Sequence, residues 1–194
     1  LTAPTAHGRL YEVDMRLRPS GTQGPVATSW QSFKDYQQNK AWLWEHLALT
    51  RARVIAGEGS LGEDVEALRC EMVSRARAPE MVLSEVAKMR LRIQAAKQAA
   101  FWDGKLGAGR LQEIELIGQA GLLGGGSDAR SIEIGLEQTV ALGWLAPEQS
   151  VALARSYRLF WQMQLSTKLL SEQVIDDEQM PDVIGLGGLA FLLR

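Results

Sequence analysis

The sequence predicts a mainly α-helical fold in which a bundle of helices follows one β-strand near the start of the chain. Residues 11–18 alternate apolar and polar side chains without interruption, which is the period of a half-buried strand. From about residue 29 onward, apolar side chains recur every three or four residues, which is the period of amphipathic helices. Because short connections join these helical segments, we expect an antiparallel helical bundle.

Composition narrows the class of protein. A chain of 194 residues is long enough for one or two domains with a real core, and its net charge of −2 offers no broad field for nucleic acid. The single cysteine, Cys70, fits a reducing cytoplasm, and two histidines, His7 and His46, are too few for a histidine-based metal site. No apolar run approaches the length of a membrane span. We therefore expect a protein without nucleic-acid or membrane partners, and its cysteine content is compatible with the cytoplasm.

The strand over residues 10–18 has an unusual polar face. Its apolar face is formed by Tyr11, Val13, Met15 and Leu17, and its polar face by Glu12, Asp14, Arg16 and Arg18. A carboxylate of this row is able to hold a divalent metal, and a guanidinium two residues away is able to bind phosphate oxygens. The alternative is a salt-bridged edge strand that stays polar to prevent aggregation, and the row alone favours this alternative.

Local signals place the helices. Ser29 is expected to cap a helix that continues past Glu45, and residues 51–55 either extend that helix or form a short strand. Pro79 suits the first turn of another helix, and Pro147 opens a long helix that reaches about residue 170. A shorter helix with Ile132, Leu136 and Val140 on its apolar face is expected to end at Gly143.

Two glycine-rich segments resemble phosphate or metal loops only superficially. Residues 104–109 lack the Gly-Lys-Ser/Thr that opens the helix of a phosphate-binding loop, so they are interpreted as a connection. Residues 125–130 read GGSDAR, in which Arg130 takes the place of a second acidic residue. We interpret this segment as a loop in which Ser127 or Asp128 caps the following helix.

Three motifs carry a resemblance to a known family. They are residues 12–21 (EVDMRLRPSG), residues 24–26 (GPV) and residues 41–57, which contain AWLWEHLAL followed by TRARVIAG. These motifs resemble the bifunctional glutamine synthetase adenylyltransferase/adenylyl-removing enzyme, and the RPSG and AWxWEHxAL forms resemble its C-terminal, adenylylating half. The resemblance is dense over residues 7–57 and continues weakly to about residue 170 as a helical pattern.

The resemblance implies a domain organisation. Residues 1–58 would be the C-terminal part of a nucleotidyltransferase domain of the α+β type, contributing its terminal strand and helix. Residues 59–194 would form the antiparallel helical bundle.

The resemblance also implies an active site. Members of the family transfer AMP from ATP to a tyrosine of glutamine synthetase, using three carboxylates that hold two Mg²⁺ ions, and Asp14 matches the third carboxylate. Arg16, Arg18 and Ser20 are the first choices for nucleotide contacts, because they share or follow the polar face of the strand. Three further residues match a family motif and are candidates either for orienting the site or for salt bridges between helix and sheet: Glu45, Arg51 and Arg53.

One departure from the family affects the expected activity. The first two carboxylates belong to a Gly-Ser-Asp-x-Asp turn, and the sequence has no such turn before Asp14. We therefore expect a fragment of a longer protein, with little or no transferase activity by itself. The alternative is an interaction module in which the helical region binds glutamine synthetase, a PII-type signalling protein or the other catalytic half of the enzyme.

Overall fold

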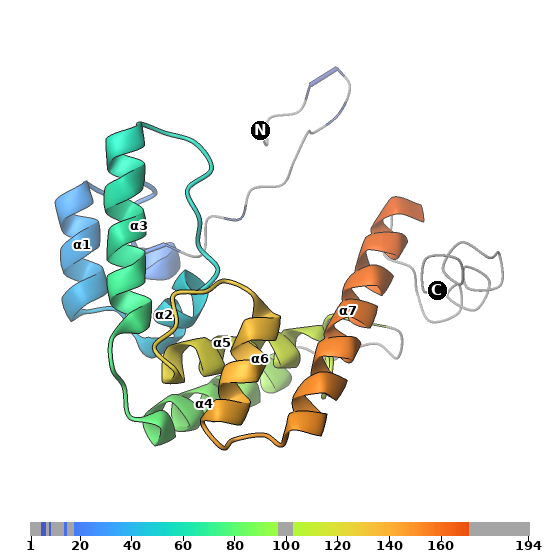
Figure 1. The fold of residues 1–194 in the computed structure, drawn as a ribbon. Coiled ribbons are helices and arrows are strands. Elements are labelled where there is room, and N and C mark those ends of the chain that lie inside the picture. The colour runs from blue at the N-terminus through green and yellow to red at the C-terminus, as the bar shows by residue number, and fades with distance from the viewer. Residues whose placement is uncertain (1–4, 7, 9–13, 15–17, 97–102, 171–194) are drawn as a thin grey trace.

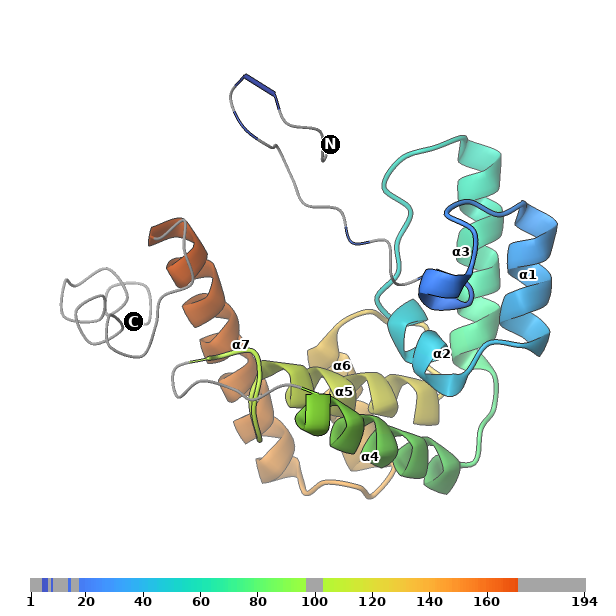
Figure 2. The same ribbon diagram turned by 180° about the vertical axis from the view of Figure 1, so that it is seen from behind.

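The computed structural model describes residues 5, 6, 8, 14, 18–96 and 103–170, and it shows a mainly α-helical chain (Figure 1). A short 3₁₀ helix, η1 (Gly21–Gln23), comes first. Seven α-helices follow within the described residues: α1 (Trp30–Asn39), α2 (Leu43–Leu49), α3 (Gly59–Ser74), α4 (Pro79–Ala96), α5 (Leu111–Gly124), α6 (Ile132–Ala141) and α7 (Pro147–Leu170). In both views α1 and α3 lie side by side, and α7 flanks the opposite side of the α4–α6 group (Figures 1 and 2).

The helical part of the predicted fold is confirmed, and the strand stays a prediction. Most of the strand expected over residues 10–18 falls outside the described residues. Within the described part of the chain, the only β-type pairing is an isolated bridge between Thr5 and Gly8.

The helix expected from Ser29 past Glu45 is two helices, so that prediction was wrong in its extent. Ser29 does cap α1, because its side chain accepts a hydrogen bond from the Ser32 N–H at 3.3 Å. The helix then ends at Asn39, and α2 starts again at Leu43 after three residues. Residues 51–55, for which helix and strand were both open, are neither: α2 ends at Leu49 and irregular backbone follows.

Most other helix ends follow their local signals. Pro79 and Pro147 are the first residues of α4 and α7, as predicted. Gly143 follows α6 with a φ of 71°, the left-handed conformation that glycine tolerates best. The prediction that Ser127 or Asp128 caps the next helix was wrong, since Ser131 caps α6 through the N–H groups of Glu133 and Ile134.

One apolar core joins the helices on both sides of the expected domain boundary near residue 58. Leu47 of α2 is buried together with side chains from α3, α4 and α5: Val73, Val82, Val86, Ala120 and Leu123. Half-buried side chains of Leu43, Trp44, Leu49, Leu116 and Trp144 surround this group. The short helix α2 is thus anchored in the helical bundle, and the division at residue 58 stays a prediction.

The closest helix packing in the described structure lies between α5 and α6. These two helices share the most extensive helix–helix contact, and three glycines let their backbones approach. A Cβ atom built on Gly135 would lie 2.1 Å from the carbonyl oxygen of Gly118, and one on Gly121 would lie 2.0 Å from that of Gly135. A second apolar cluster continues from this contact to α7 and contains Ile114, Ile132 and Leu136. Close approach of the two backbones therefore sets the geometry of this half of the protein.

Among the helices of the described residues, none combines the length and the apolar character that crossing a lipid bilayer requires.

Replacement of Gly135 by alanine should destabilise the protein by about 1–3 kcal/mol, because the new methyl group collides with backbone of α5 that has no room to move. Urea unfolding of the Gly135→Ala variant measures this loss. Gly59→Ala is the matched control, since a Cβ at Gly59 meets nothing within 4 Å. Equal stability of the two variants would contradict the close packing.

Candidate functional site

A groove of about 660 Å³ is lined by several of the predicted site residues. Residues of α1, α2, α4 and α5 line it, together with Arg18 and Pro19, which precede η1, and Arg51 and Ala52, which follow α2. Its apolar walls are formed by Phe33, Trp44, Leu47, Leu49, Met89, Ile93 and Leu116. The groove therefore lies where the first part of the chain meets the helical bundle.

A polar junction beside the groove connects α1, α2 and the turn before η1. The Tyr36 hydroxyl donates to the Glu45 carboxylate, with distances of 2.9 and 3.1 Å to its two oxygens. The same hydroxyl oxygen accepts the Ser20 N–H at 3.0 Å, and Glu45 also accepts the Trp42 N–H at 2.8 Å. Glu45 is buried in the first turn of α2, where a negative charge is favourable, and the N–H that it binds belongs to the N-cap residue Trp42.

His46 makes the second connection between α1 and its neighbours. Its Nε2 atom lies 3.1 Å from the carbonyl oxygen of Gln37, and its Nδ1 atom lies 3.2 Å from Nη2 of Arg77. A guanidinium only donates hydrogen bonds, so Nδ1 must accept and Nε2 must carry the proton. Burial lowers the pKa of His46, the hydrogen bond to Gln37 opposes this, and the charge of Arg77 lowers the pKa further. The net direction is downward, so the ring is held in its neutral form.

The structure brings three of the predicted site residues together around this groove: Arg18, Glu45 and Arg51. The Arg18 Nε–H donates to the carbonyl oxygen of Gly24 at 3.3 Å, and Arg51 forms an ion pair with Glu115 at 2.7 Å. Ser20 is exposed, has a φ of 61°, and does not line the groove, but its N–H binds Tyr36, which in turn binds Glu45.

The remaining predicted residues lie elsewhere. Arg53 is exposed and lines a separate cavity of about 100 Å³ beside α3. Asp14 is exposed and does not line the groove, and Arg16 lies outside the described residues.

The described residues do not form a complete metal site. A carboxylate such as Asp14 has the oxygen chemistry that Mg²⁺ prefers. However, no group of three or more His, Cys, Asp or Glu side chains able to hold a metal is present in the described part of the chain.

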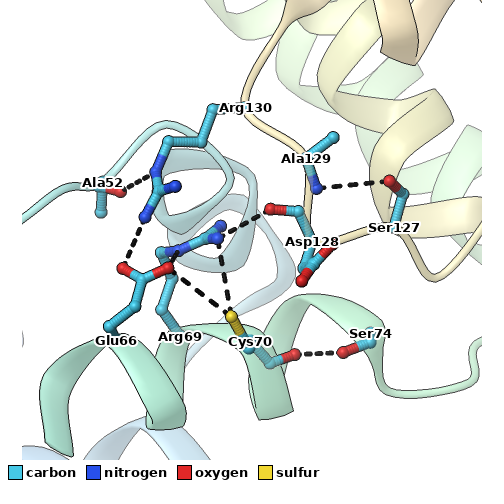
Figure 3. A network of polar contacts seen from close by, with 9 residues as sticks. All are labelled: Ala52, Glu66, Arg69, Cys70, Ser74, Ser127, Asp128, Ala129 and Arg130. Carbon is cyan, nitrogen blue, oxygen red and sulfur yellow. Dashed lines mark hydrogen bonds and ion pairs between the residues drawn. The ribbon is translucent and has the colours of Figure 1, made fainter. Parts of the chain in front are cut away.

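The loop at residues 127–130 has a structural role (Figure 3). Arg69 of α3 is 3% exposed; its Nε–H donates to Glu66 at 2.9 Å and its Nη2 donates to the carbonyl oxygen of Asp128 at 2.7 Å. Arg130 binds Glu66 through Nη2 and the carbonyl oxygen of Ala52 through Nε, at 2.8 Å for the second contact. The network fixes the α5–α6 loop and the chain after α2 onto α3, which agrees with the interpretation of residues 125–130 as a loop, although the cap predicted within it was wrong.

Electrostatics also give structural roles to two acidic residues. Burial raises the pKa of Glu66, but the hydrogen bonds from Arg69 and Arg130 outweigh it and leave the pKa below its usual value. The same balance sets the pKa of Glu113. Burial raises it, but hydrogen bonds from the Gly109 N–H, Arg90 and Gln94 hold it below the usual value. Glu113 thereby joins α4 to α5.

Three residues were not predicted from the sequence: Gln37 and Gln112, which line the groove, and Tyr36, which binds the groove residue Glu45. Tyr36 and Gln37 follow helical spacing like any other residues, and only their contacts with α2 reveal their positions. The side-chain oxygens Oε1 of Gln37 and Gln112 are buried, and neither has a hydrogen-bond partner among the described residues. Both residues line the groove.

Comparison with known proteins identifies similar sequences. Residues 1–68 match the family model described as glutamate-ammonia ligase adenylyltransferase. A relative from Bradyrhizobium diazoefficiens is 47% identical over 119 residues, covering 61% of this chain and 12% of the relative. One from Rhizobium meliloti is 50% identical over 120 residues, again covering 61% and 12%. One from Bradyrhizobium sp. is 36% identical over 200 residues, covering 100% of this chain and 20% of the relative.

The chain is thus similar to adenylyltransferases. More narrowly, all three relatives carry the name bifunctional glutamine synthetase adenylyltransferase/adenylyl-removing enzyme, which confirms the resemblance drawn from residues 12–57. The chain spans between 12% and 20% of the length of these relatives.

Replacement of Tyr36 by phenylalanine should lower the free energy of unfolding by about 1–3 kcal/mol, because a buried carboxylate loses a donor. Urea unfolding of Tyr36→Phe, Glu45→Gln and the double variant measures the coupling between the two side chains. Additive losses would show that the Tyr36–Glu45 hydrogen bond contributes nothing to stability.

Stability should fall at mildly acidic pH through His46. Its folded pKa lies below the ordinary value of 6.5, so protonation favours the unfolded chain. The contribution is complete above about pH 6.5 and is lost as the pH falls from there toward the folded pKa, with a slope of at most about 1.4 kcal/mol per pH unit. Unfolding of the wild-type protein and of His46→Gln between pH 7.5 and 5 tests this. We expect a flatter profile for the variant, and parallel profiles would exclude His46 as the cause.

Proposed function

We propose that the chain is part of an enzyme that transfers AMP from ATP to a tyrosine of glutamine synthetase, and thereby controls nitrogen assimilation. The similarity to adenylyltransferases over the first 68 residues carries this proposal. The grouping of Arg18, Glu45 and Arg51 around one groove supports it, since these residues come from separate parts of the matched segment.

Each residue has a role in this proposal. Asp14 would hold a Mg²⁺ ion, which neutralises phosphate charge and lowers the pKa of the attacking hydroxyl when it is bound. Arg16 and Arg18 would bind phosphate oxygens of ATP, and Ser20 would donate a hydrogen bond to them. Glu45 would position Ser20 through Tyr36, since the two are linked by hydrogen bonds. Arg51 and Arg53 would orient the edge of the site.

The remaining parts of the proposal concern partners and location. We propose glutamine synthetase as the substrate protein, a PII-type signalling protein and the other half of the bifunctional enzyme as further partners, and the cytoplasm as the compartment. A binding role for the helices after residue 59 is a second candidate, favoured by exposed apolar side chains on α7, among them Val151, Leu159 and Leu165.

Replacement of Asp14 by asparagine in the full-length enzyme should abolish AMP transfer and leave folding intact, because an amide does not replace a carboxylate as a Mg²⁺ ligand. Transfer of radiolabelled AMP from MgATP to glutamine synthetase measures activity, and circular dichroism measures folding. Asp64→Asn is the matched control, since Asp64 is exposed on α3 and does not line the groove. An active Asp14→Asn enzyme would remove Asp14 from the metal site.

The isolated 194-residue chain serves as a second control in the same assay. Its sequence has no Gly-Ser-Asp-x-Asp turn before Asp14 to supply the first two carboxylates, so we expect little or no transfer. Efficient transfer by this chain alone would contradict the assignment of further ligands to the rest of the enzyme.

A further inference from the structure

The turn over residues 18–24 is closed by its own backbone. The Gly21 N–H donates to the carbonyl oxygen of Arg18 at 2.8 Å, and the Gly24 N–H donates to that of Gly21 at 3.2 Å. The Arg18 side chain adds a hydrogen bond from its Nε–H to the carbonyl oxygen of Gly24. A Cβ atom built on Gly24 would lie 2.0 Å from the carbonyl oxygen of Pro19, so a larger residue at this position would force the turn open.

Ser20 lies at the strained point of this turn. Its φ of 61° is in the left-handed region, and no other non-glycine residue in the described part of the chain has a positive φ. A Cβ atom disfavours this conformation, so contacts from the surrounding structure must stabilise it. One such contact comes from outside the turn, because the Ser20 N–H donates to the hydroxyl oxygen of Tyr36 on α1 at 3.0 Å.

Tyr36 connects this turn to the helical bundle. Its hydroxyl accepts the Ser20 N–H and donates to the Glu45 carboxylate, whose two oxygens lie 2.9 and 3.1 Å away. Glu45 is buried and also accepts the Trp42 N–H at 2.8 Å. The helix that carries Glu45, α2, is fixed in the apolar core through Leu47. Two consecutive hydrogen bonds therefore tether the turn to the bundle, and both of them use the Tyr36 hydroxyl.

We propose that Tyr36 is a positioning residue for ATP, which holds the turn over residues 18–24 in the conformation that lets Arg18 and Ser20 bind the triphosphate. The proposal rests on the proposed function, which assigns these two contacts. It adds a residue that none of the three sequence motifs contains, and it places the effect on ATP binding. A weaker tether lowers the fraction of enzyme in which the turn is competent to bind, and the apparent affinity for ATP falls by the same factor.

Steady-state AMP transfer by the full-length enzyme tests the proposal, with MgATP varied at saturating glutamine synthetase. In Tyr36→Phe we expect the KM for ATP to rise roughly tenfold, the effect of losing a hydrogen bond, while kcat changes less than about twofold. A merely structural role would instead remove active molecules, and would lower the apparent kcat at an unchanged KM. Tyr157→Phe is the matched control, since it loses the same hydroxyl group from α7 beside the second apolar cluster, and should keep the wild-type KM.

Gly24→Ala perturbs the same turn without changing Tyr36. We expect a comparable rise in the KM for ATP, because the new methyl group opens the turn. Once the turn is open, loss of the Tyr36 hydroxyl should add little, so the double variant should fall short of the product of the two single effects. Hydrogen–deuterium exchange of residues 18–24 in the full-length enzyme is a readout independent of activity. Exchange should be faster in Tyr36→Phe than in the wild-type enzyme, and unchanged in Tyr157→Phe.

Four results would overturn the proposal. An unchanged KM for ATP in Tyr36→Phe, with or without a loss of kcat, would mean that the hydroxyl does not serve ATP binding. An unchanged KM in Gly24→Ala would mean that the shape of the turn does not matter to ATP. Multiplicative effects in the double variant would place the action of Tyr36 outside the turn, and unchanged exchange in Tyr36→Phe would remove the tether.

Failure of this proposal and failure of the proposed function are distinguishable. The proposed function stands when the wild-type full-length enzyme transfers AMP and Asp14→Asn does not, whatever Tyr36→Phe does to the KM for ATP. A wild-type enzyme that transfers no AMP to glutamine synthetase would overturn both.

Discussion

The seven-residue helix α2 depends on burial of its apolar face, and the rest of the groove depends on α2. A helix this short is not stable in isolation, because the cost of its first turn is shared by few hydrogen bonds. Leu47 buries that face against α3, α4 and α5, while Glu45 and His46 connect the same turn to α1. Every wall of the groove therefore contacts α2 or a helix packed on it. A change that releases α2 from the core would remove the groove as well.

The polar groups around α2 divide into two kinds. Glu45, His46 and Thr50 are buried and hydrogen-bonded, so they contribute to a unique arrangement of the helices. Gln37 and Gln112 are different, because their buried oxygens lack partners among the described residues. A protein that keeps such atoms gives up stability at that position. Buried polar atoms without partners concentrate where proteins bind other molecules, because the bound molecule supplies the missing hydrogen bond.

The arginines show how one residue type serves both purposes. Arg69 and Arg77 are used within the fold: the first fixes the α5–α6 loop, and the second binds carbonyl oxygens near the end of α3 together with His46. Arg18 and Arg51 instead line the groove. The family motifs singled out Arg18 and Arg51 in the sequence, whereas nothing in the sequence assigned a role to Arg69 or Arg77. Their roles follow from which helix packs opposite each guanidinium.

What the sequence determined by itself is local. The caps and prolines at Ser29, Pro79 and Pro147 set helix starts, and the helical period set the class of the fold, because both act within a few residues along the chain. The motifs of residues 12–57 were enough to identify the family that the chain resembles. Only the tertiary structure decided where the long first helix breaks, since no glycine or proline marks residues 40–42. At this break, burial of Leu47 and the hydrogen bonds of Glu45 stabilise the chain more than an unbroken helix would. The same long-range contacts place Gln37 and Gln112 in one groove.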